Sequence, residues 1–188
     1  MSDLTLLGLC GALRAGSTNR KLLHFAAGRF GPARFVEGDL RLPLYDGDVE
    51  AQGMPEAVVR LGEQLHAADA VLIACPEYNK GISGVMKNTL DWLSRVKGGP
   101  WRDKPVAIMS AAAGRAGGER SQFMLRLCLN AFRPRVLPGP EVLVANSSEA
   151  FDADGTLIVE SYLPMIDELM ADLRRAALTA RTSQSEAA

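Results

Sequence analysis

The chain has 188 residues, of which 47% are hydrophobic and 23% charged, and its formal net charge is −1. This length suits one domain with a sizeable core, and the balanced charge excludes the basic face that nucleic acid or an acidic membrane would attract. No apolar run approaches the roughly 20 residues of a membrane span, and the N-terminus lacks a basic signal region. We therefore expect a cytoplasmic protein whose partners are small molecules or further copies of itself.

Four apolar runs rich in β-forming residues alternate with stretches compatible with helix. They cover residues 4–10, 33–36, 70–75 and 105–110. This alternation is typical of a parallel sheet with covering helices. The runs TLLGLC and AVLIAC are almost continuously apolar, which indicates strands buried on both faces in the middle of the sheet.

Helices are expected between and after these strands. Residues 55–68 place apolar side chains on one face and charged side chains on the other, an amphipathic pattern. Further helices are predicted over residues 85–95, 119–132 and 159–177.

The last strand is expected within residues 133–144, at an edge of the sheet. Pro138 and Pro140 interrupt it, and proline cannot donate to a ladder of hydrogen bonds. The small, polar residues 179–188 predict a disordered tail, so the single domain is expected to cover residues 1–178.

Three cysteines, Cys10, Cys75 and Cys128, are widely spaced within apolar stretches. This pattern favours buried thiols in a reducing compartment over disulfides or a zinc site, and no metal ligands are expected. Neither His24 nor His66 lies near a cluster of carboxylates or cysteines, so no acid–base role is assigned to either.

The glycine-rich segment GALRAGSTNR follows the first strand and opens the first helix. Backbone N–H groups and the helix dipole converge there, where an anion can sit. The segment offers close backbone approach, polar donors and one fixed positive charge, from Gly11, Gly16, Ser17, Thr18, Asn19 and Arg14. Ser17 stands where a P-loop needs lysine, and the GxGxxG fingerprint is absent. The segment predicts a cradle for a terminal monophosphate; the alternative is an ordinary turn capped by Ser17.

A second loop, PEYNKGISG, lies at the carboxyl end of the 70–75 strand, beside the first loop. Pro76 stiffens the exit from the strand, Tyr78 offers an aromatic face, and Gly81 and Gly84 leave backbone amides open to a planar ligand. The alternative is a turn with a surface tyrosine.

Three segments together resemble one known family. GALRAGSTNRKL resembles the GSxRxxSxNxxL motif of the NADPH-dependent FMN reductase family, a flavodoxin-like group that includes quinone, azo-dye and chromate reductases. PEYNKGISGVMKNTLDWLSR is similar to PEYNxSxPxxLKNxIDWxSR, and AAAGRAGGERSQFMLR is similar to SPGxxGGxRxQxxLR. The similarity runs from about residue 4 to residue 173.

The resemblance implies a flavodoxin-like three-layer α/β sandwich whose five parallel strands lie in the order 2-1-3-4-5. It implies FMN as cofactor, NADPH or NADH as co-substrate, and a small acceptor such as a quinone, free flavin, azo compound or metal oxyanion. No catalytic side chain is expected, because the redox chemistry belongs to the flavin. By position in the motifs, the resemblance assigns the FMN phosphate to Arg14, Ser17 and Asn19. It assigns the isoalloxazine ring to Pro76, Glu77, Tyr78 and Asn79, with Gly114 on the other side of the ring.

The chain departs from the family motifs at a few positions. Ala12 replaces a serine, Ala112 and Ala113 replace a serine and a proline, and Gly81 and Ser83 replace another such pair. These changes bear on the strength of FMN binding more than on its location. Two other functions stay open: a flavodoxin-type electron carrier, and a non-enzymatic module that binds flavin or phosphate.

The resemblance also implies pairing of subunits near the flavin, as a homodimer or homotetramer. Arg126 and Glu141 follow the GG pair, Gly117 and Gly118, and are candidate interface residues. In the KNTLDW segment, Asp91 and Trp92 are expected to pack and make polar contacts, whereas Lys87 and Asn88 are expected to support loop and subunit geometry.

Overall fold

A parallel sheet forms the middle layer of the computed structural model, which describes residues 4–187, with side chains to residue 183. Its strands are β1 (Leu4–Cys10), β2 (Ala33–Glu37), β3 (Ala70–Ala74), β6 (Pro105–Ala111), β7 (Arg135–Val136) and β8 (Val142–Val144). They lie in the order β2-β1-β3-β6, and both β7 and β8 pair with β6 on its outer side. Counting β7 and β8 as one interrupted strand gives the order 2-1-3-4-5, so the predicted flavodoxin-like topology is confirmed.

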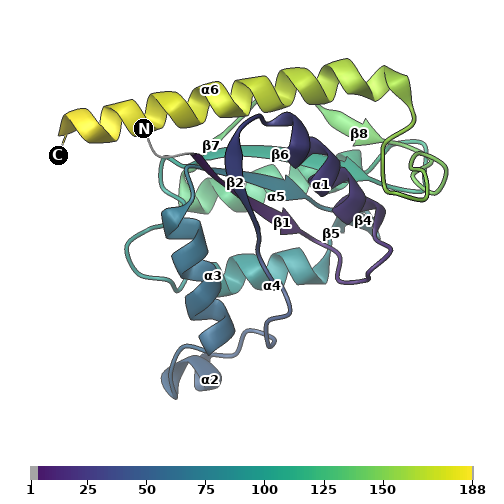
Figure 1. Cartoon of the computed structure of the whole chain (residues 1–188). Coiled ribbons are helices and arrows are strands. Elements are labelled where there is room, and N and C mark those ends of the chain that lie inside the picture. Colours follow the sequence, from purple (N-terminus) through teal and green to yellow (C-terminus); the bar gives the residue numbers. More distant parts are fainter. Residues whose placement is uncertain (1–3, 188) are drawn as a thin grey trace.

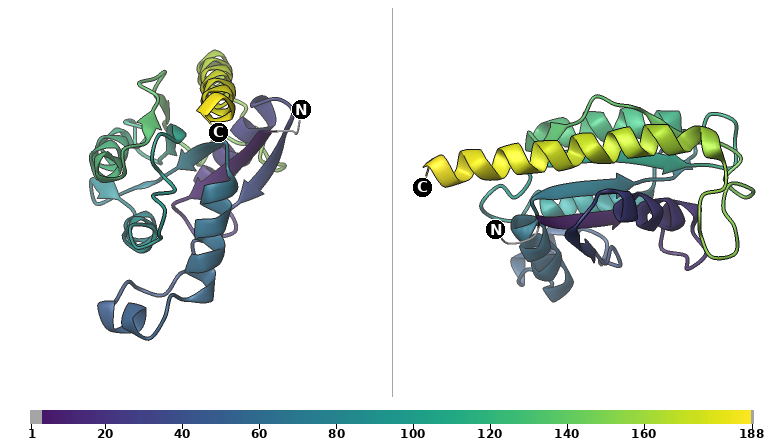
Figure 2. Two further views of the ribbon diagram at one scale, coloured as in Figure 1. Left: turned by 90° about the vertical axis from the view of Figure 1, so that its left-hand side faces the viewer. Right: turned by 45° about the horizontal axis from the view of Figure 1, so that its top comes forward.

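Helices cover both faces of the sheet. On one face lie α1 (Thr18–Arg29) and α6 (Leu163–Ala187); on the other lie α3 (Glu56–Ala67), α4 (Gly84–Leu93) and α5 (Glu119–Leu129) (Figures 1 and 2). The strands feed both cores because successive side chains point to opposite faces. On β1, Leu6 packs toward α1 and α6, whereas Leu7 and Leu9 pack toward α3 and α4. The three-layer sandwich is therefore confirmed.

The last strand is interrupted as its prolines predict. The Leu137 N–H donates to the Val106 carbonyl at 2.9 Å, and pairing with β6 resumes only at Val142. Pro138 and Pro140 lie between these two residues and have no N–H to donate. The ladder is broken at the edge of the sheet, where an interruption disturbs only one neighbour.

The final helix differs most from its prediction. We expected it to end near residue 177, but α6 continues to Ala187 through residues assigned to a disordered tail. Thr179, Thr182 and Ser183 each donate their hydroxyl to the carbonyl four residues earlier, and Arg181 pairs with Asp69 at 3.4 Å. The predicted end of this helix was wrong, because it was judged from the small, polar composition of the last residues, which does not reveal these contacts. No helix within residues 4–187 is both long and apolar enough to cross a membrane.

Two short elements were not anticipated. One is α2 (Gly47–Ala51), which begins at the cap residue Asp46 and projects below the sheet in Figure 1. The other is a hairpin of β4 (Glu77–Tyr78) and β5 (Gly81–Ile82) inside the segment expected to be a loop. Both are too short to produce a periodic pattern.

The cysteines are unpaired. Cys10 and Cys75 are buried, as predicted, whereas Cys128 is only half-buried. Burial raises the pKa of the Cys75 thiol to about 11 and also raises the pKa of Cys10. Both thiols therefore stay protonated at neutral pH, which makes them weak nucleophiles.

The GG pair before α5 is fixed by close backbone contact. Gly117 and Gly118 have φ angles of 59° and 96°, a region that side chains other than glycine rarely adopt. A Cβ on Gly117 would lie 2.4 Å from the backbone C and O atoms of Leu143. Gly117 also accepts a 2.7 Å hydrogen bond from Ser110 Oγ through its carbonyl. This turn therefore lets the chain leave β6 and pass against β8 before α5 begins.

Replacing Gly117 should destabilise the fold strongly. In Gly117→Ala the new Cβ meets backbone atoms that cannot rotate away, so we expect a loss of about 2–5 kcal/mol in the free energy of unfolding. The measurement is urea unfolding of the purified variant. Gly28→Ala is the matched control: it lies in α1 with open space around it, and should be neutral or stabilise by up to about 1 kcal/mol. Equal stability of the two variants would contradict the backbone contact.

Candidate functional site

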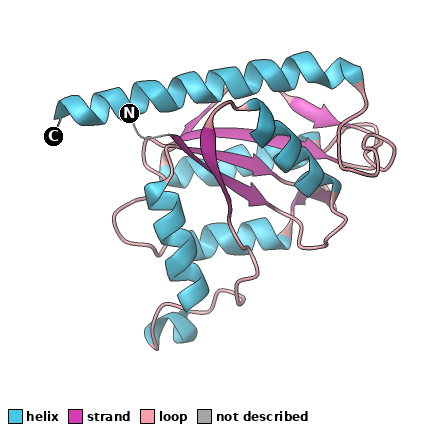
Figure 3. Cartoon of the chain, in the orientation of Figure 1, coloured by secondary structure: helices cyan, strands magenta, loops and turns pink. Residues whose placement is uncertain are grey.

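Three loops leave the carboxyl ends of neighbouring strands: loop A (residues 11–17) after β1, loop B (residues 75–83) after β3, and loop C (residues 112–118) after β6. Because the strands are parallel, the loops emerge at one edge of the sheet (Figure 3). The Gly11 N–H donates to the Ala74 carbonyl at 2.9 Å, and a Cβ on Gly11 would lie 3.0 Å from both Pro76 Cδ and Ser83 Oγ. Loops A and B are therefore in direct contact, as the sequence predicted.

The start of α1 presents free backbone donors. Ser17 is its N-cap, and its hydroxyl oxygen accepts from the Arg20 N–H at 3.4 Å, which is the cap named in the alternative interpretation of this segment. Within the described part of the chain, the N–H groups of Thr18 and Asn19 have no acceptor. Such free amides at the positive end of a helix favour an anion.

Loop A contributes a single cation, Arg14. Its side chain is exposed and makes no ion pair with any carboxylate of residues 4–183. Nη1 lies 3.8 Å from the position that a Cβ on Gly16 would take, so the guanidinium folds back over the loop. Arg14 can therefore add a positive charge beside the helix start.

Asn19 is placed differently from its expected role. The side chain is buried, its Nδ2 donates to the Ala111 carbonyl at 2.7 Å, and its Oδ1 accepts from the Ala111 N–H at 3.0 Å. Both polar atoms are thus bonded to the last residue of β6. Only the Asn19 backbone N–H faces the position where a phosphate is expected.

Loop B projects as the β4–β5 hairpin. Asn79 and Lys80 have φ angles of 50° and 66°, the pair of positive values typical of a two-residue hairpin turn. Tyr78 is 52% exposed, whereas Pro76 is buried. The hairpin therefore presents an aromatic side chain to solvent beside loop A.

The carboxylate of Glu77 points away from the hairpin, toward α5. Its Oε2 accepts from the Arg120 N–H at 3.1 Å, and Oε1 lies 3.7 Å from Arg120 Nη1. Glu77 therefore joins loop B to the end of loop C. The exposed Gly114 lies in the middle of loop C, and a Cβ on it would meet nothing within 4 Å. Loop C thus offers open backbone at the position where a flat ligand is expected.

The KNTLDW segment supports a further loop. Asn88 Nδ2 and Trp92 Nε1 both donate to the Pro43 carbonyl, at 2.9 Å and 2.8 Å, and Asn88 Oδ1 accepts from the Tyr45 N–H. The packing and polar contact predicted for Trp92 are confirmed. The motif residues therefore fix the segment after β2 against α4.

Sequence reasoning missed a fourth segment at this edge, the chain after β8. Ser147 is buried, its N–H donates to the Ala112 carbonyl at 3.1 Å, and its Oγ accepts from Thr18 Oγ1 at 3.2 Å. It thus links loop C to the start of α1. No motif marked it, because the contact joins residues 129 positions apart.

The two histidines lie outside the three loops. His24 Nε2 is 2.7 Å from Glu37 Oε2, and the same carboxylate pairs with Arg20. The His66 ring contacts the Lys97 carbonyl at 3.0 Å. Among the described residues, no cluster of three metal-ligating side chains occurs.

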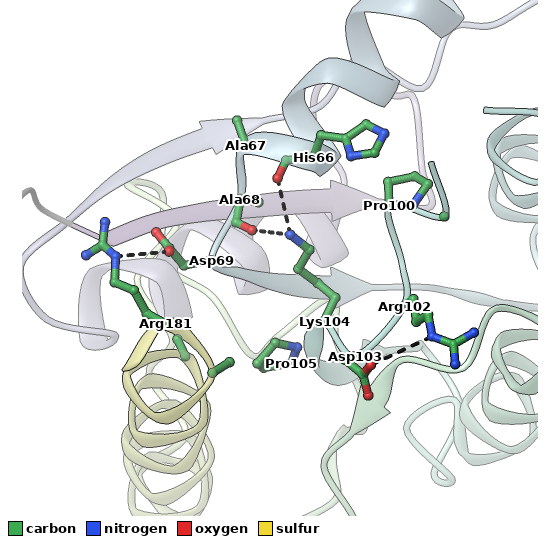
Figure 4. A pocket seen from close by; sticks show the side chains of 13 residues that line it. His66, Ala67, Ala68, Asp69, Pro100, Arg102, Asp103, Lys104, Pro105 and Arg181 are labelled. Atoms are coloured by element: carbon green, nitrogen blue, oxygen red, sulfur yellow. Dashed lines mark hydrogen bonds and ion pairs between the residues drawn. The ribbon is translucent and has the colours of Figure 1, made fainter. Parts of the chain in front are cut away.

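A polar pocket of about 300 Å³ opens at the opposite edge, where β3 and β6 begin (Figure 4). Its central cation, Lys104, donates to the carbonyls of His66 and Ala68 at the end of α3, and burial lowers its pKa. Cations at helix C-termini stabilise the helix. This pocket is therefore explained by structural contacts, and open α/β sheets bind ligands at the other edge.

Comparison with known proteins shows which family the chain resembles. The sequence pattern of the family described as NADPH-dependent FMN reductase matches residues 4–149, which contain all three loops. The chain is 42% identical, over 92% of its length and 94% of the relative, to an NAD(P)H-dependent FMN reductase of Pseudomonas aeruginosa. It is 38% identical to a quinone reductase of Escherichia coli K12, over 74% of this chain and 77% of that one.

Among solved structures, the flavoenzyme NAD(P)H:(acceptor) oxidoreductase of Paracoccus denitrificans superimposes with a TM-score of 0.84 at 28% identity. The superposition covers 94% of this chain and 98% of that one. Matched by the family pattern over most of its length and 42% identical to a curated member, the chain belongs to the NADPH-dependent FMN reductase family.

Proposed function

We propose that the protein is an FMN-dependent oxidoreductase that passes electrons from NAD(P)H to a small acceptor. The observation that carries this proposal is the meeting of loops A, B and C, each bearing a family motif, at one edge of the sheet. FMN, when bound, supplies the redox chemistry between NAD(P)H and the acceptor. The protein supplies binding, orientation and an open surface for the two substrates.

The residues present fit the phosphate end of FMN. The free amides of Thr18 and Asn19, the Ser17 cap and the unpaired guanidinium of Arg14 form a donor set without a competing carboxylate. A phosphate monoester carries about two negative charges at neutral pH, which this donor set would balance. We therefore assign the phosphate to Arg14, Ser17 and the start of α1.

The isoalloxazine ring is assigned to loops B and C. Tyr78 offers an exposed aromatic face, and the chain from Pro76 to Asn79 offers backbone groups. Gly114 leaves the opposite side open, since no atom stands within 4 Å of where its Cβ would be. A flavin ring held there would have loop B on one side and loop C on the other, and NAD(P)H and the acceptor would need access to a face that these loops leave uncovered.

The acceptor is proposed to be a quinone or another flat, electron-poor molecule, with free flavin, azo compounds and metal oxyanions as further members of the class. The similarity to a quinone reductase supports this class. An open ring surface places no strong restriction on the shape of the acceptor. The buried free thiols Cys10 and Cys75 are in keeping with the reducing conditions of the cytoplasm.

Anaerobic mixing with NADPH tests the function. The FMN-loaded protein should lose its visible flavin absorbance within seconds, and added quinone should restore it. An electron carrier of the flavodoxin type would bind FMN but react slowly with NADPH. A protein that takes up no FMN at all would favour a non-enzymatic module.

The phosphate assignment predicts a selective loss in Arg14→Ala. A hydrogen bond to a charged group contributes roughly 1.5–3 kcal/mol, so FMN affinity should fall by about 10- to 150-fold while riboflavin affinity barely changes. The measurement is fluorescence titration of apoprotein with each ligand.

Tyr78→Ala is the matched control for Arg14→Ala, because it removes a contact to the ring, which both ligands share. An aromatic contact is worth about 0.5–1.5 kcal/mol, so Tyr78→Ala should weaken FMN and riboflavin equally and only severalfold. Equal weakening of the two ligands by Arg14→Ala would withdraw the phosphate assignment.

We also propose that the protein is a homo-oligomer whose interface includes α5. Phe123, Met124 and Leu127 on α5 are 52%, 41% and 71% exposed, and Tyr78 lies on the hairpin that packs beside this helix. Exposed apolar patches of this kind mark interfaces. Arg126, also expected there, instead donates to the Leu137 carbonyl at 2.7 Å and so supports the edge strand, whereas Glu141 is exposed.

Light scattering of Leu127→Asp tests the interface. The charge introduced on α5 should convert a dimer or tetramer to a smaller species at micromolar concentration, because burying an unpaired carboxylate is unfavourable. Leu178→Asp, at an exposed apolar position of α6, is the control and should leave the mass unchanged. A monomeric wild-type protein with full activity would count against this proposal.

A further inference from the structure

Loop C is attached at both of its ends by side chains from other parts of the chain. It contains residues 112–118 and has no helix or strand of its own. Asn19, at the start of α1 behind loop A, bonds to Ala111 immediately before the loop. Glu77, in loop B, accepts a hydrogen bond from the Arg120 N–H, two residues after the loop ends. The two attachments lie on either side of Gly114.

At the first attachment, Asn19 takes the place of a missing strand. β3 ends at Ala74, and the Cys75 N–H donates to the Met109 carbonyl at 3.1 Å in the last bond between β3 and β6. Two residues further along β6, both backbone groups of Ala111 bond to the Asn19 side chain, at 2.7 Å and 3.0 Å. The side-chain amide thus continues the ladder after β3 has turned away. Because Asn19 is only 3% exposed, these bonds are shielded from water.

At the second attachment, Glu77 caps α5 from a distant part of the chain. The N-cap residue of α5 is Gly118, which has no side chain to accept a hydrogen bond. Glu77, 43 positions away from Arg120, supplies the acceptor at 3.1 Å. Its carboxylate also lies at the positive end of the helix, and its side chain is 15% exposed. Loop B therefore provides the cap that the local sequence of α5 lacks.

We propose that Asn19 and Glu77 are positioning residues that preset loop C relative to loops A and B, and that neither contacts the flavin through its side chain. The proposal rests on the proposed function, in which these loops hold the flavin. A loop that already has its bound conformation loses little conformational entropy when the ligand binds. The affinity for the ligand is therefore higher. The motif residues that resemblance assigned to direct flavin contact thus act through loop C.

Amide hydrogen exchange of the apoprotein, followed residue by residue, is the primary test. Loss of a helix cap should speed exchange at the capped end by about 2- to 30-fold. Glu77→Ala should therefore raise exchange at residues 117–121, and Asn19→Ala at residues 111–114. Strands β1 and β2 should keep their protection in both variants. Glu63→Ala, at an exposed position of α3, is the control and should change neither region.

Rescue by conservative variants separates positioning from other roles. Glu77→Gln keeps an acceptor for the Arg120 N–H and should exchange nearly as the wild type. Glu77→Asp, one methylene shorter, should show part of the increase, and it replaces the alanine variant if that one fails to fold. Titrations should show that Glu77→Ala weakens FMN and riboflavin by a similar factor.

Two results would overturn the proposal. Unchanged exchange in loop C with weakened FMN binding would make these side chains direct ligands. Faster exchange spread evenly over the whole protein would make their role one of general stability. Because the exchange measurement needs no flavin, it decides the proposal even if the wild-type protein binds no FMN, an outcome that would instead refute the proposed function.

Discussion

The burial of β1, β3 and β6 on both faces is the constraint from which the site follows. All five residues of β3 are buried, and its two sets of alternate side chains enter separate cores under different helices. Parallel neighbours need a crossover connection, usually a helix, and helices on both faces cover such strands on both sides. Each crossover begins at the carboxyl end of a strand, so loops A, B and C are forced to one edge. The packing of buried residues outside the candidate site therefore brings the three loops of the site together.

Glycine is required where these loops touch other chain segments. Gly11 passes beside Pro76 and Ser83, and Gly117 passes against the backbone of Leu143 with a positive φ. At both positions a side chain would push apart two segments that the fold brings together. The departures from the family pattern have local explanations of the same kind: Ser83 caps α4 through the Met86 N–H, and Gly81 leaves room for Met124.

The two ends of the sheet carry different electrostatics. At the carboxyl edge, the amides at the start of α1 and the guanidinium of Arg14 lack partners among the described residues, so positive potential remains for a ligand. At the amino edge, the Lys104 ammonium is bonded to carbonyls at the end of α3, and Arg181 is paired with Asp69. A pocket whose charges are already satisfied has little left to offer an anion. The two edges thus differ in whether their donors and cations already have partners, and the volume of a pocket does not show this difference.

The resemblance to a family implied the sheet order, whereas the residues themselves indicated the main strands and helices, the interrupted edge strand and the three loops that carry the family motifs. The sequence by itself determined these local features. It could do so because apolar periodicity and glycine-rich turns act over a few residues and leave a local pattern. Only the tertiary structure decided the hydrogen bonds of the Asn19 side chain, the Glu77 cap on α5, the contact of Thr18 with Ser147, and the extension of α6 to Ala187. The first three are hydrogen bonds between residues 43 to 129 positions apart, and α6 gains an ion pair with the distant Asp69. Such contacts depend on how the layers pack, so no local pattern of residues announces them.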